Sequence, residues 1–193
     1  MEVRKIYQNR GDIGHTNPHD IGKLGTSMND TKERQGASQT RKKILIIDDH
    51  PVVRQGLTQF INQHADLVVC AEAANAKQAL KAVDKQHFDL AIVDMLLKNT
   101  TGIQVTKNLK SRCPGLHVLI LSMSKEPYYI KESFQAGARG YVTKEEVAEE
   151  IINAIRQVLD GKIYLSAHLA KKFPRKTLER IKAGYLDDSV WQY

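Results

Sequence analysis

Cysteine is scarce in this sequence. Only Cys70 and Cys113 occur among 193 residues, and they form no Cys-x-x-Cys pair. So few cysteines, so placed, exclude a disulfide framework as the basis of the fold. We expect each of them to be a small buried hydrophobic residue in a reducing compartment.

Long apolar runs are also missing. No stretch approaches the roughly 20 apolar residues that a membrane-spanning helix needs, and the N-terminus shows no hydrophobic signal region. These absences predict a cytoplasmic protein with no membrane partner. The loops after the first two predicted strands contain no Gly-x-Gly-x-x-Gly pattern, which argues against a dinucleotide site.

Charge is unevenly distributed along the chain, whose net charge is +7. Residues 42–161 carry 15 basic and 14 acidic side chains, whereas residues 162–193 carry 7 and 3. A basic surface is a hint of nucleic acid or membrane contact, but a sparse basic tail is more often a solvated linker. Charge alone therefore leaves DNA binding undecided.

Residues 1–41 are polar, dotted with glycine and without sustained periodicity, so we expect a disordered N-terminal extension. His15 and His19 stand four positions apart with Asp20 following, a spacing that binds metal on a helix. No helix is indicated there, so a metal site is not favoured. Met28 offers a second plausible start of translation.

The segment 42–161 alternates short apolar strands with amphipathic helices. The predicted strands are 44–47, 67–71, 88–94, 117–121 and 140–144. Asn75 is a good N-cap for the second helix, while Gly137 and Gly161 are typical residues after a helix end. Five βα units with apolar strands predict an α/β fold with a parallel sheet covered on both faces. Of the doubly wound arrangements, the flavodoxin-like order 2-1-3-4-5 fits five strands.

Polar residues follow the predicted strands: Asp48 and Asp49 the first, Asp94 the third, Ser122 the fourth and Lys144 the fifth. In a parallel sheet these positions share one edge. Three carboxylates so close repel each other, and a hard cation such as Mg²⁺ relieves that repulsion. Each residue alone would be an ordinary cap or turn residue, but the combination predicts a site for a phosphoryl group on Asp94.

Four stretches carrying these residues resemble the receiver domain of response regulators, most closely the NarL/FixJ (LuxR-type) class. They are DDHPVVRQGL at 48–57, DLAIVDM at 89–95 with Gly102 eight residues after Asp94, LSMS at 121–124 and AGARGYVTKE at 136–145. The resemblance covers about residues 43–161. It implies a signalling module rather than an enzyme, one that accepts a phosphoryl group on Asp94 from a sensor histidine kinase or phosphotransfer protein.

The same resemblance assigns roles to the other residues. Asp49, Asp94 and the main-chain carbonyl of Leu96 would bind Mg²⁺, with Asp48 supporting the ion through water. Lys144 would pair with the phosphoryl oxygens. Ser122 and Tyr141 would form a conformational switch, in which a dianion at Asp94 draws Ser122 inward and makes room for the tyrosine. The alternative for Tyr141 is a purely structural role as a packed core residue.

Some positions depart from the family pattern. Lys98 and Thr100 occupy a turn that often contains proline, and Glu145 stands where receivers generally have proline, although the NarL class often has an acid there. Leu96 and Ser124 occupy positions that influence attack by water on the phosphorylated aspartate. Neither is a strong base, so we expect slow self-dephosphorylation.

The tail over residues 162–193 is too short for the helix-turn-helix domain that follows NarL-class receivers. It reads as a basic linker with at most one short helix holding Leu178 and Ile181, and Trp191 and Tyr193 could dock it onto the receiver or onto a partner. Two alternative functions remain. The chain could be a DNA-binding transcription regulator that acts as a homodimer with a degenerate output domain, or an aspartyl-phosphate hydrolase with Asp94 as its nucleophile.

Overall fold

The computed structural model describes residues 40–192. The N-terminal extension predicted for residues 1–41 lies almost entirely outside the described residues, as do the His15–His19 pair and Met28. Within the described part, every helix is too short or too polar to cross a lipid bilayer.

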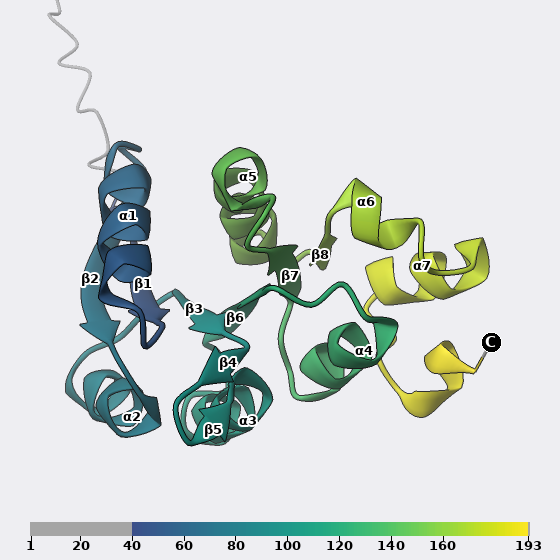
Figure 1. Cartoon of the computed structure of the whole chain (residues 1–193), viewed down its shortest axis with the longest axis horizontal. Helices are drawn as coiled ribbons and strands as arrows, with labels where there is room; N and C mark the ends of the chain where they lie inside the picture. Colours follow the sequence, from purple (N-terminus) through teal and green to yellow (C-terminus); the bar gives the residue numbers. More distant parts are fainter. Residues whose placement is uncertain (1–39, 193) are drawn as a thin grey trace, which may run out of the picture. The chain divides into compact units, whose positions relative to one another are not determined.

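The core is a parallel sheet with the strand order β2-β1-β3-β6-β7-β8 (Figure 1). Its strands are β1 Lys42–Ile47, β2 Leu67–Ala73, β3 Leu90–Asp94, β6 His117–Ser122, β7 Gly140–Thr143 and β8 Tyr164–Leu165. The first five lie in the order that the sequence predicts, and the doubly wound fold class is confirmed. The expectation of five strands was one short, because β8 pairs with β7 and extends the sheet.

Helices cover both faces of this sheet. They are α1 Pro51–Asn62, α2 Ala76–Lys85, α3 Gly102–Arg112, α4 Pro127–Gln135 and α5 Val147–Leu159. Side chains alternate between the faces of a strand, so Ile44 and Ile46 of β1 pack with α1 and α5, whereas Leu45 and Ile47 pack with α2, α3 and α4. Each of these side chains is fully buried, which stabilises the fold by about 2 kcal/mol apiece.

The predicted helix boundaries follow from local chemistry. The side-chain oxygen of Asn75 accepts a hydrogen bond from the N–H of Gln78 at 3.0 Å, which caps α2 as expected. Gly137 and Gly161 have φ angles of 102° and 79°, the left-handed conformation that ends a helix most easily at glycine.

The cysteines differ from the prediction. Cys70 is exposed and Cys113 is only partly buried. Along β1 and β2, Ile44 pairs with Val69 but Leu45 pairs with Ala71, so Cys70 is the extra residue of a β-bulge on an edge strand. The bulge turns the side chain of Cys70 outward. The apolar run that contains Cys70 does not predict a bulge.

After Asp94 the chain forms a small hairpin of β4 Leu96–Leu97 and β5 Thr100–Thr101. Asn99 supplies the turn with a φ of 68°, a conformation that asparagine tolerates better than most residues. The side-chain oxygen of Thr101 caps α3 by accepting the N–H of Gln104, and the N–H of Gly102 donates to the carbonyl of Met95 at 2.8 Å. The turn over Lys98–Thr100, which lacks the proline often found in the family, is therefore held by the pairing of β4 with β5.

The tail contains more structure than the single short helix that the sequence indicated. After β8 come α6 Ala167–Ala170, α7 Arg175–Lys182 and the 3₁₀ helix η1 Asp188–Trp191. Six buried apolar residues of this tail join the same apolar cluster as α4; they are Ile163, Leu169, Phe173, Ile181, Val190 and Trp191. Buried Tyr164 of β8 joins the cluster on the other face of the sheet. Tertiary packing stabilises these elements, which are too short to persist alone. Tyr193 lies outside the described residues.

Candidate functional site

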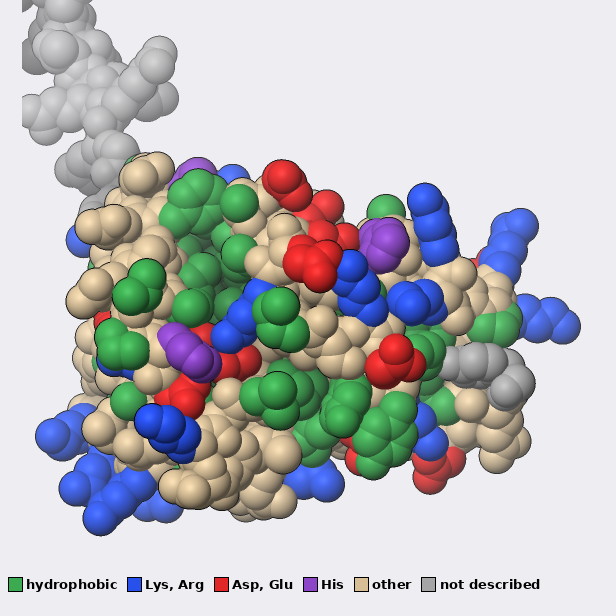
Figure 2. All heavy atoms as spheres, viewed as in Figure 1, with side chains coloured by type: hydrophobic (Ala, Val, Ile, Leu, Met, Phe, Trp, Pro, Cys, Tyr) green, Lys and Arg blue, Asp and Glu red, His purple; other side chains and the backbone are tan. Residues whose placement is uncertain are grey.

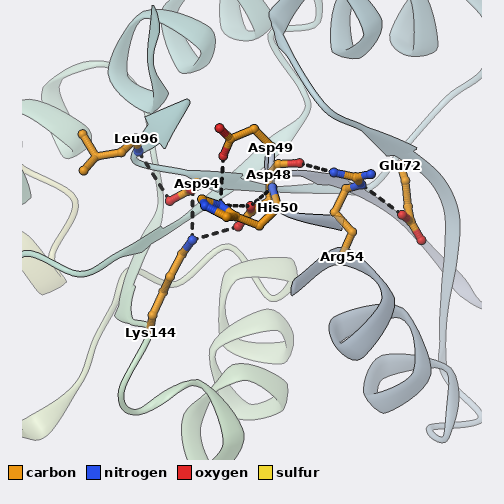
Figure 3. Close-up of polar contacts among 8 residues, drawn as sticks. All are labelled: Asp48, Asp49, His50, Arg54, Glu72, Asp94, Leu96 and Lys144. Carbon is orange, nitrogen blue, oxygen red and sulfur yellow. Dashed lines mark hydrogen bonds and ion pairs between the residues drawn. The ribbon is translucent and has the colours of Figure 1, made fainter. Parts of the chain in front are cut away.

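Three carboxylates meet at the carboxyl edge of the sheet because β1 and β3 are parallel neighbours. Ile47, the last residue of β1, pairs with Val93. Asp48 and Asp49 follow β1, and Asp94 is the last residue of β3. Figure 3 shows the three acids close together, with the side chain of Lys144 directed at Asp48 and Asp94.

Lys144 joins two of the acids. Its Nζ lies 2.8 Å from Oδ2 of Asp48 and 2.9 Å from Oδ2 of Asp94. The two carboxylates are almost inaccessible, at 2% and 4% exposure, so the ammonium supplies the charge that makes their burial tolerable. Burial acts to lower the pKa of Lys144, but its hydrogen bonds to Asp48 and Asp94 outweigh this and raise it, which keeps the ammonium charged.

Asp94 lies in an environment that raises its pKa. Burial raises the pKa of its carboxyl, the nearby charge of Asp48 acts in the same direction, and Lys144 opposes both. The N–H of Leu96 donates to Oδ1 of Asp94 at 3.4 Å. The Leu96 side chain points away from the acids and is 65% exposed (Figure 3).

The cluster has the donor set for a divalent cation. One oxygen from each of Asp48, Asp49 and Asp94 and a ring nitrogen of His50 lie within 4.8 Å of one another. Among residues 40–192, Oδ1 of Asp49 is buried without a hydrogen bond, although Nδ1 of His50 lies 3.0 Å away. Oxygen atoms crowded in this way fit a hard cation such as Mg²⁺, which the sequence predicted for these acids.

His50, Arg54 and Glu72 support the acids, a role that was not predicted from the sequence. The main-chain N–H of His50 donates to Oδ1 of Asp48 at 2.8 Å. Arg54 donates to the main-chain carbonyl of Asp48 at 2.6 Å and to Glu72 at 3.1 Å. In the sequence, the one sign that Arg54 lies near the acids is its position one helical turn after His50. Its partner Glu72 on β2 is visible only in the three-dimensional structure (Figure 3).

Ser122 lies at the end of β6, on the strand next to Asp94, and is 1% exposed. Its hydroxyl accepts the N–H of Ser124 at 3.0 Å, and its carbonyl accepts the N–H of Lys144 at 2.8 Å. Tyr141 is fully buried beneath α4, and its hydroxyl donates to the carbonyl of Ser124 at 2.8 Å. Burial raises the pKa of Tyr141 to about 12. Both residues of the predicted switch thus contact the start of the β6–α4 loop.

An apolar groove of about 310 Å³ lies between α1 and α5 and reaches Lys144. Its lining is Val52, Val53, Gly56, Leu57, Phe60, Leu121, Lys144, Val147, Ala148 and Ile151. Figure 2 shows hydrophobic side chains in this hollow and further ones around the acid cluster. Among the described residues, exposed Leu96, Met123 and Tyr128 continue the apolar surface on the loops beside Asp94 and at the start of α4.

Known proteins share this architecture. The response regulator receiver domain family matches residues 44–156, more than half of the chain. The chain is 33% identical over 127 residues to the transcriptional activator protein ExaE of Pseudomonas putida, covering 66% of this chain and 59% of that protein. It is 31% identical over 137 residues to the response regulator GacA of Pseudomonas aeruginosa, covering 71% and 64%. The chain thus spans about three fifths of the length of these curated relatives.

Solved structures agree. A two-component response regulator of the LuxR family from Aurantimonas sp. SI85-9A1 is 30% identical, with a TM-score of 0.67 over 74% of this chain and 99% of that chain. The receiver domain of NarL from Mycobacterium tuberculosis is 26% identical, with a TM-score of 0.60 over 63% and 98%. The matched residues run from β1 into α5 and include the whole acid cluster with Lys144, so this chain belongs to the response regulator receiver family, with relatives of the NarL/LuxR type.

Proposed function

We propose that Asp94 accepts a phosphoryl group from a phosphohistidine of a sensor histidine kinase or phosphotransfer protein in the cytoplasm. The observation that carries this proposal is the ion pair between Lys144 and Asp94 within a cluster of three buried or nearly buried acids. A carboxylate placed beside a fixed ammonium can take up a phosphoryl group whose charge the ammonium neutralises.

In the transfer, a carboxylate oxygen of Asp94 forms a bond to phosphorus while the bond from phosphorus to the histidine nitrogen breaks, and its electron pair returns to the imidazole. Asp49, Asp94 and the carbonyl of Leu96 would hold Mg²⁺, with Asp48 acting through water. When bound, this cation neutralises charge on the phosphoryl oxygens. Lys144 orients the same oxygens from the other side.

Phosphorylation then acts on the β6–α4 loop. A phosphoryl group brings a charge of about −1.5 to −2 and several hydrogen-bond acceptors. Ser122, on the neighbouring strand, is the hydroxyl that can donate to it, and doing so alters its present bond with the N–H of Ser124. Because Tyr141 donates to the carbonyl of Ser124, the change extends to the tyrosine. This supports the Ser122–Tyr141 switch.

The groove between α1 and α5 supports a helical protein as the phosphoryl donor. The groove reaches Lys144, which pairs with Asp94, so a partner that fills the groove lies beside the acid cluster. An amphipathic helix fits a groove of this kind, with its apolar side chains in the groove and its histidine directed at the acids.

Mass spectrometry tests the phosphoacceptor. The chain is incubated with acetyl phosphate and Mg²⁺, and the intact mass is compared for wild type and Asp94→Asn. We expect one phosphoryl adduct on wild type and none on the variant. Asp160→Asn, at an exposed position outside the cluster, is the matched control and should accept the group normally. An adduct on Asp94→Asn, or none on wild type, contradicts the proposal.

A second function, DNA binding by a homodimer, has one observation in its favour. The basic side chains of α7 and of the turn before it are exposed; they are Lys171, Lys172, Arg175, Lys176, Arg180 and Lys182. If these side chains contact phosphates, affinity for duplex DNA falls steeply as the salt concentration rises. Reversing the charges of Arg175 and Lys176 by substitution with glutamate should then weaken this dependence of affinity on salt. Affinity that does not depend on salt excludes this function.

A further inference from the structure

The outer surface of α4 is covered by the end of the chain. In Figure 1 the last, yellow segment lies beside α4. Asp188 of η1 accepts a hydrogen bond from Gln135 at 2.8 Å and pairs with Lys131 at 3.1 Å. The hydrogen bond from Gln135, together with the hydrogen bond and charge of Lys131, lowers the pKa of Asp188. The carboxylate is therefore bound by two side chains of one helix.

Trp191 is the second anchor. Its ring stacks on Phe134 of α4, with 6.3 Å between the centroids and 19° between the planes, and meets Phe173 edge to face at 5.9 Å. Only 9% of Trp191 is exposed. The indole N–H donates to the carbonyl of Leu186 at 3.4 Å. Aromatic pairs in this arrangement contribute beyond simple burial, so the ring of Trp191 helps to hold η1 against α4.

The same helix is connected to both residues of the predicted switch through hydrogen bonds of Ser124. Ser124 connects the two switch residues, since its N–H donates to Ser122 and its carbonyl accepts from Tyr141. Its hydroxyl accepts the N–H of Glu126, the N-cap of α4. Because Tyr141 is fully buried, a partner cannot contact it directly. Any rearrangement of Tyr141 reaches the surface through α4 and what lies on it.

We propose that α4 presents a docking surface for an aromatic residue with a carboxylate three positions before it, that the chain's own Asp188–Trp191 occupies this surface, and that phosphorylation of Asp94 displaces it. This inference rests on the proposed phosphoacceptor function. The surface consists of Lys131, Phe134 and Gln135, and it becomes available to other proteins when η1 leaves.

The sequence supplies its own reporter, because Trp191 is the single tryptophan of the chain. Tryptophan emission and its quenching by acrylamide are measured on the full chain before and after treatment with acetyl phosphate and Mg²⁺. The intact mass is recorded on the same samples. We expect phosphorylation to shift emission to longer wavelength and to raise quenching, with the docked-to-undocked ratio falling by about fivefold or more. Asp94→Asn should show neither change.

Charge reversal tests the docking surface without touching the core. Lys131→Glu places a carboxylate opposite Asp188 and should raise quenching of Trp191 before any phosphorylation. Adding Asp188→Lys restores an opposite pair and should bring quenching back toward wild type. Lys107→Glu makes the same charge change at an exposed position on α3 and should leave quenching unchanged.

The outcomes separate the two proposals. If the adduct forms but emission and quenching stay as they were, the displacement is refuted while Asp94 remains the phosphoacceptor. If no adduct forms on wild type, both proposals fail. If Lys131→Glu leaves quenching as in wild type, or Asp188→Lys does not reverse its effect, the Asp188 anchor of the docking surface is refuted.

Discussion

The ammonium nitrogen of Lys144 lies 2.8 Å from Oδ2 of Asp48, although 96 positions separate the two residues along the chain. Asp48 follows β1 and Lys144 follows β7, and the strands β3 and β6 stand between them. The lysine side chain therefore reaches across the ends of β6 and β3, and at the end of β3 it also pairs with Asp94. This contact forms only when the central strands are correctly paired, so it reports on the fold and on the site together.

Replacing Lys144 tests its charge. Lys144→Met leaves Asp48 and Asp94 buried side by side without a cation, and we expect it to lower the free energy of unfolding by about 3 kcal/mol in the absence of divalent ions. Phosphoryl uptake from acetyl phosphate should slow as well. Lys144→Arg is the control, because it keeps the charge with a different shape, and it should retain more stability than the methionine variant. Urea unfolding and the rate of adduct formation provide the two measurements.

Gly102 should not tolerate a side chain. A Cβ atom there would overlap the carbonyl oxygen of Asp94 and approach Cα of Met95 to 2.9 Å, both rigid backbone atoms. We expect Gly102→Ala to lower the free energy of unfolding by about 2 kcal/mol. Gly56→Ala is the matched control, since nothing lies within 4 Å of its Cβ on α1, and it should be neutral or stabilising. Equal effects in urea unfolding would contradict this account of Gly102.

His117 should make stability depend on pH. Burial, with the nearby charges of Lys110 and Arg139, lowers its pKa below the ordinary value of 6.5. Below pH 6.5 the unfolded chain therefore binds a proton that the folded chain does not, until the folded-state pKa is reached, so stability falls as pH falls through this window. His117→Gln should reduce that fall, and His168→Gln, at an exposed position, should not. Urea unfolding on both sides of pH 6.5 measures the difference.

The phosphoryl group should leave Asp94 slowly, because the apolar side chain of Leu96 cannot orient a water molecule beside it. Leu96→Gln introduces an amide that can do so, and we expect it to speed loss of the group about tenfold, equivalent to about 1.4 kcal/mol in the barrier. Leu96→Met is the control of similar size and should match wild type. The mass of the phosphorylated protein is followed over time after the donor is removed. Rapid loss from wild type would contradict the prediction.

Local pattern was enough to determine five of the six sheet strands, their order and the edge at which the polar residues stand, but it missed β8 and the β4–β5 hairpin. Apolar runs closed by Asp94 and Ser122 are read directly from the chain, and Asn75 and Gly137 mark helix ends by chemistry that involves only their neighbours. The parallel topology then follows from general rules of connection. Asp48, Asp49, Asp94, Ser122 and Lys144 were all available at this level because each directly follows or ends a strand.

Tertiary structure alone decided the rest. A bulge between β1 and β2 turns Cys70 outward, and apolar composition contains no information about strand register. The tail looked like a basic linker because 7 of its side chains are basic and only 3 are acidic. Trp191 is buried because Phe134 of α4 and Phe173 of the tail pack against its ring. Contacts of this kind join residues distant in sequence, and their stability comes from surfaces that exist only after the sheet and its helices have assembled.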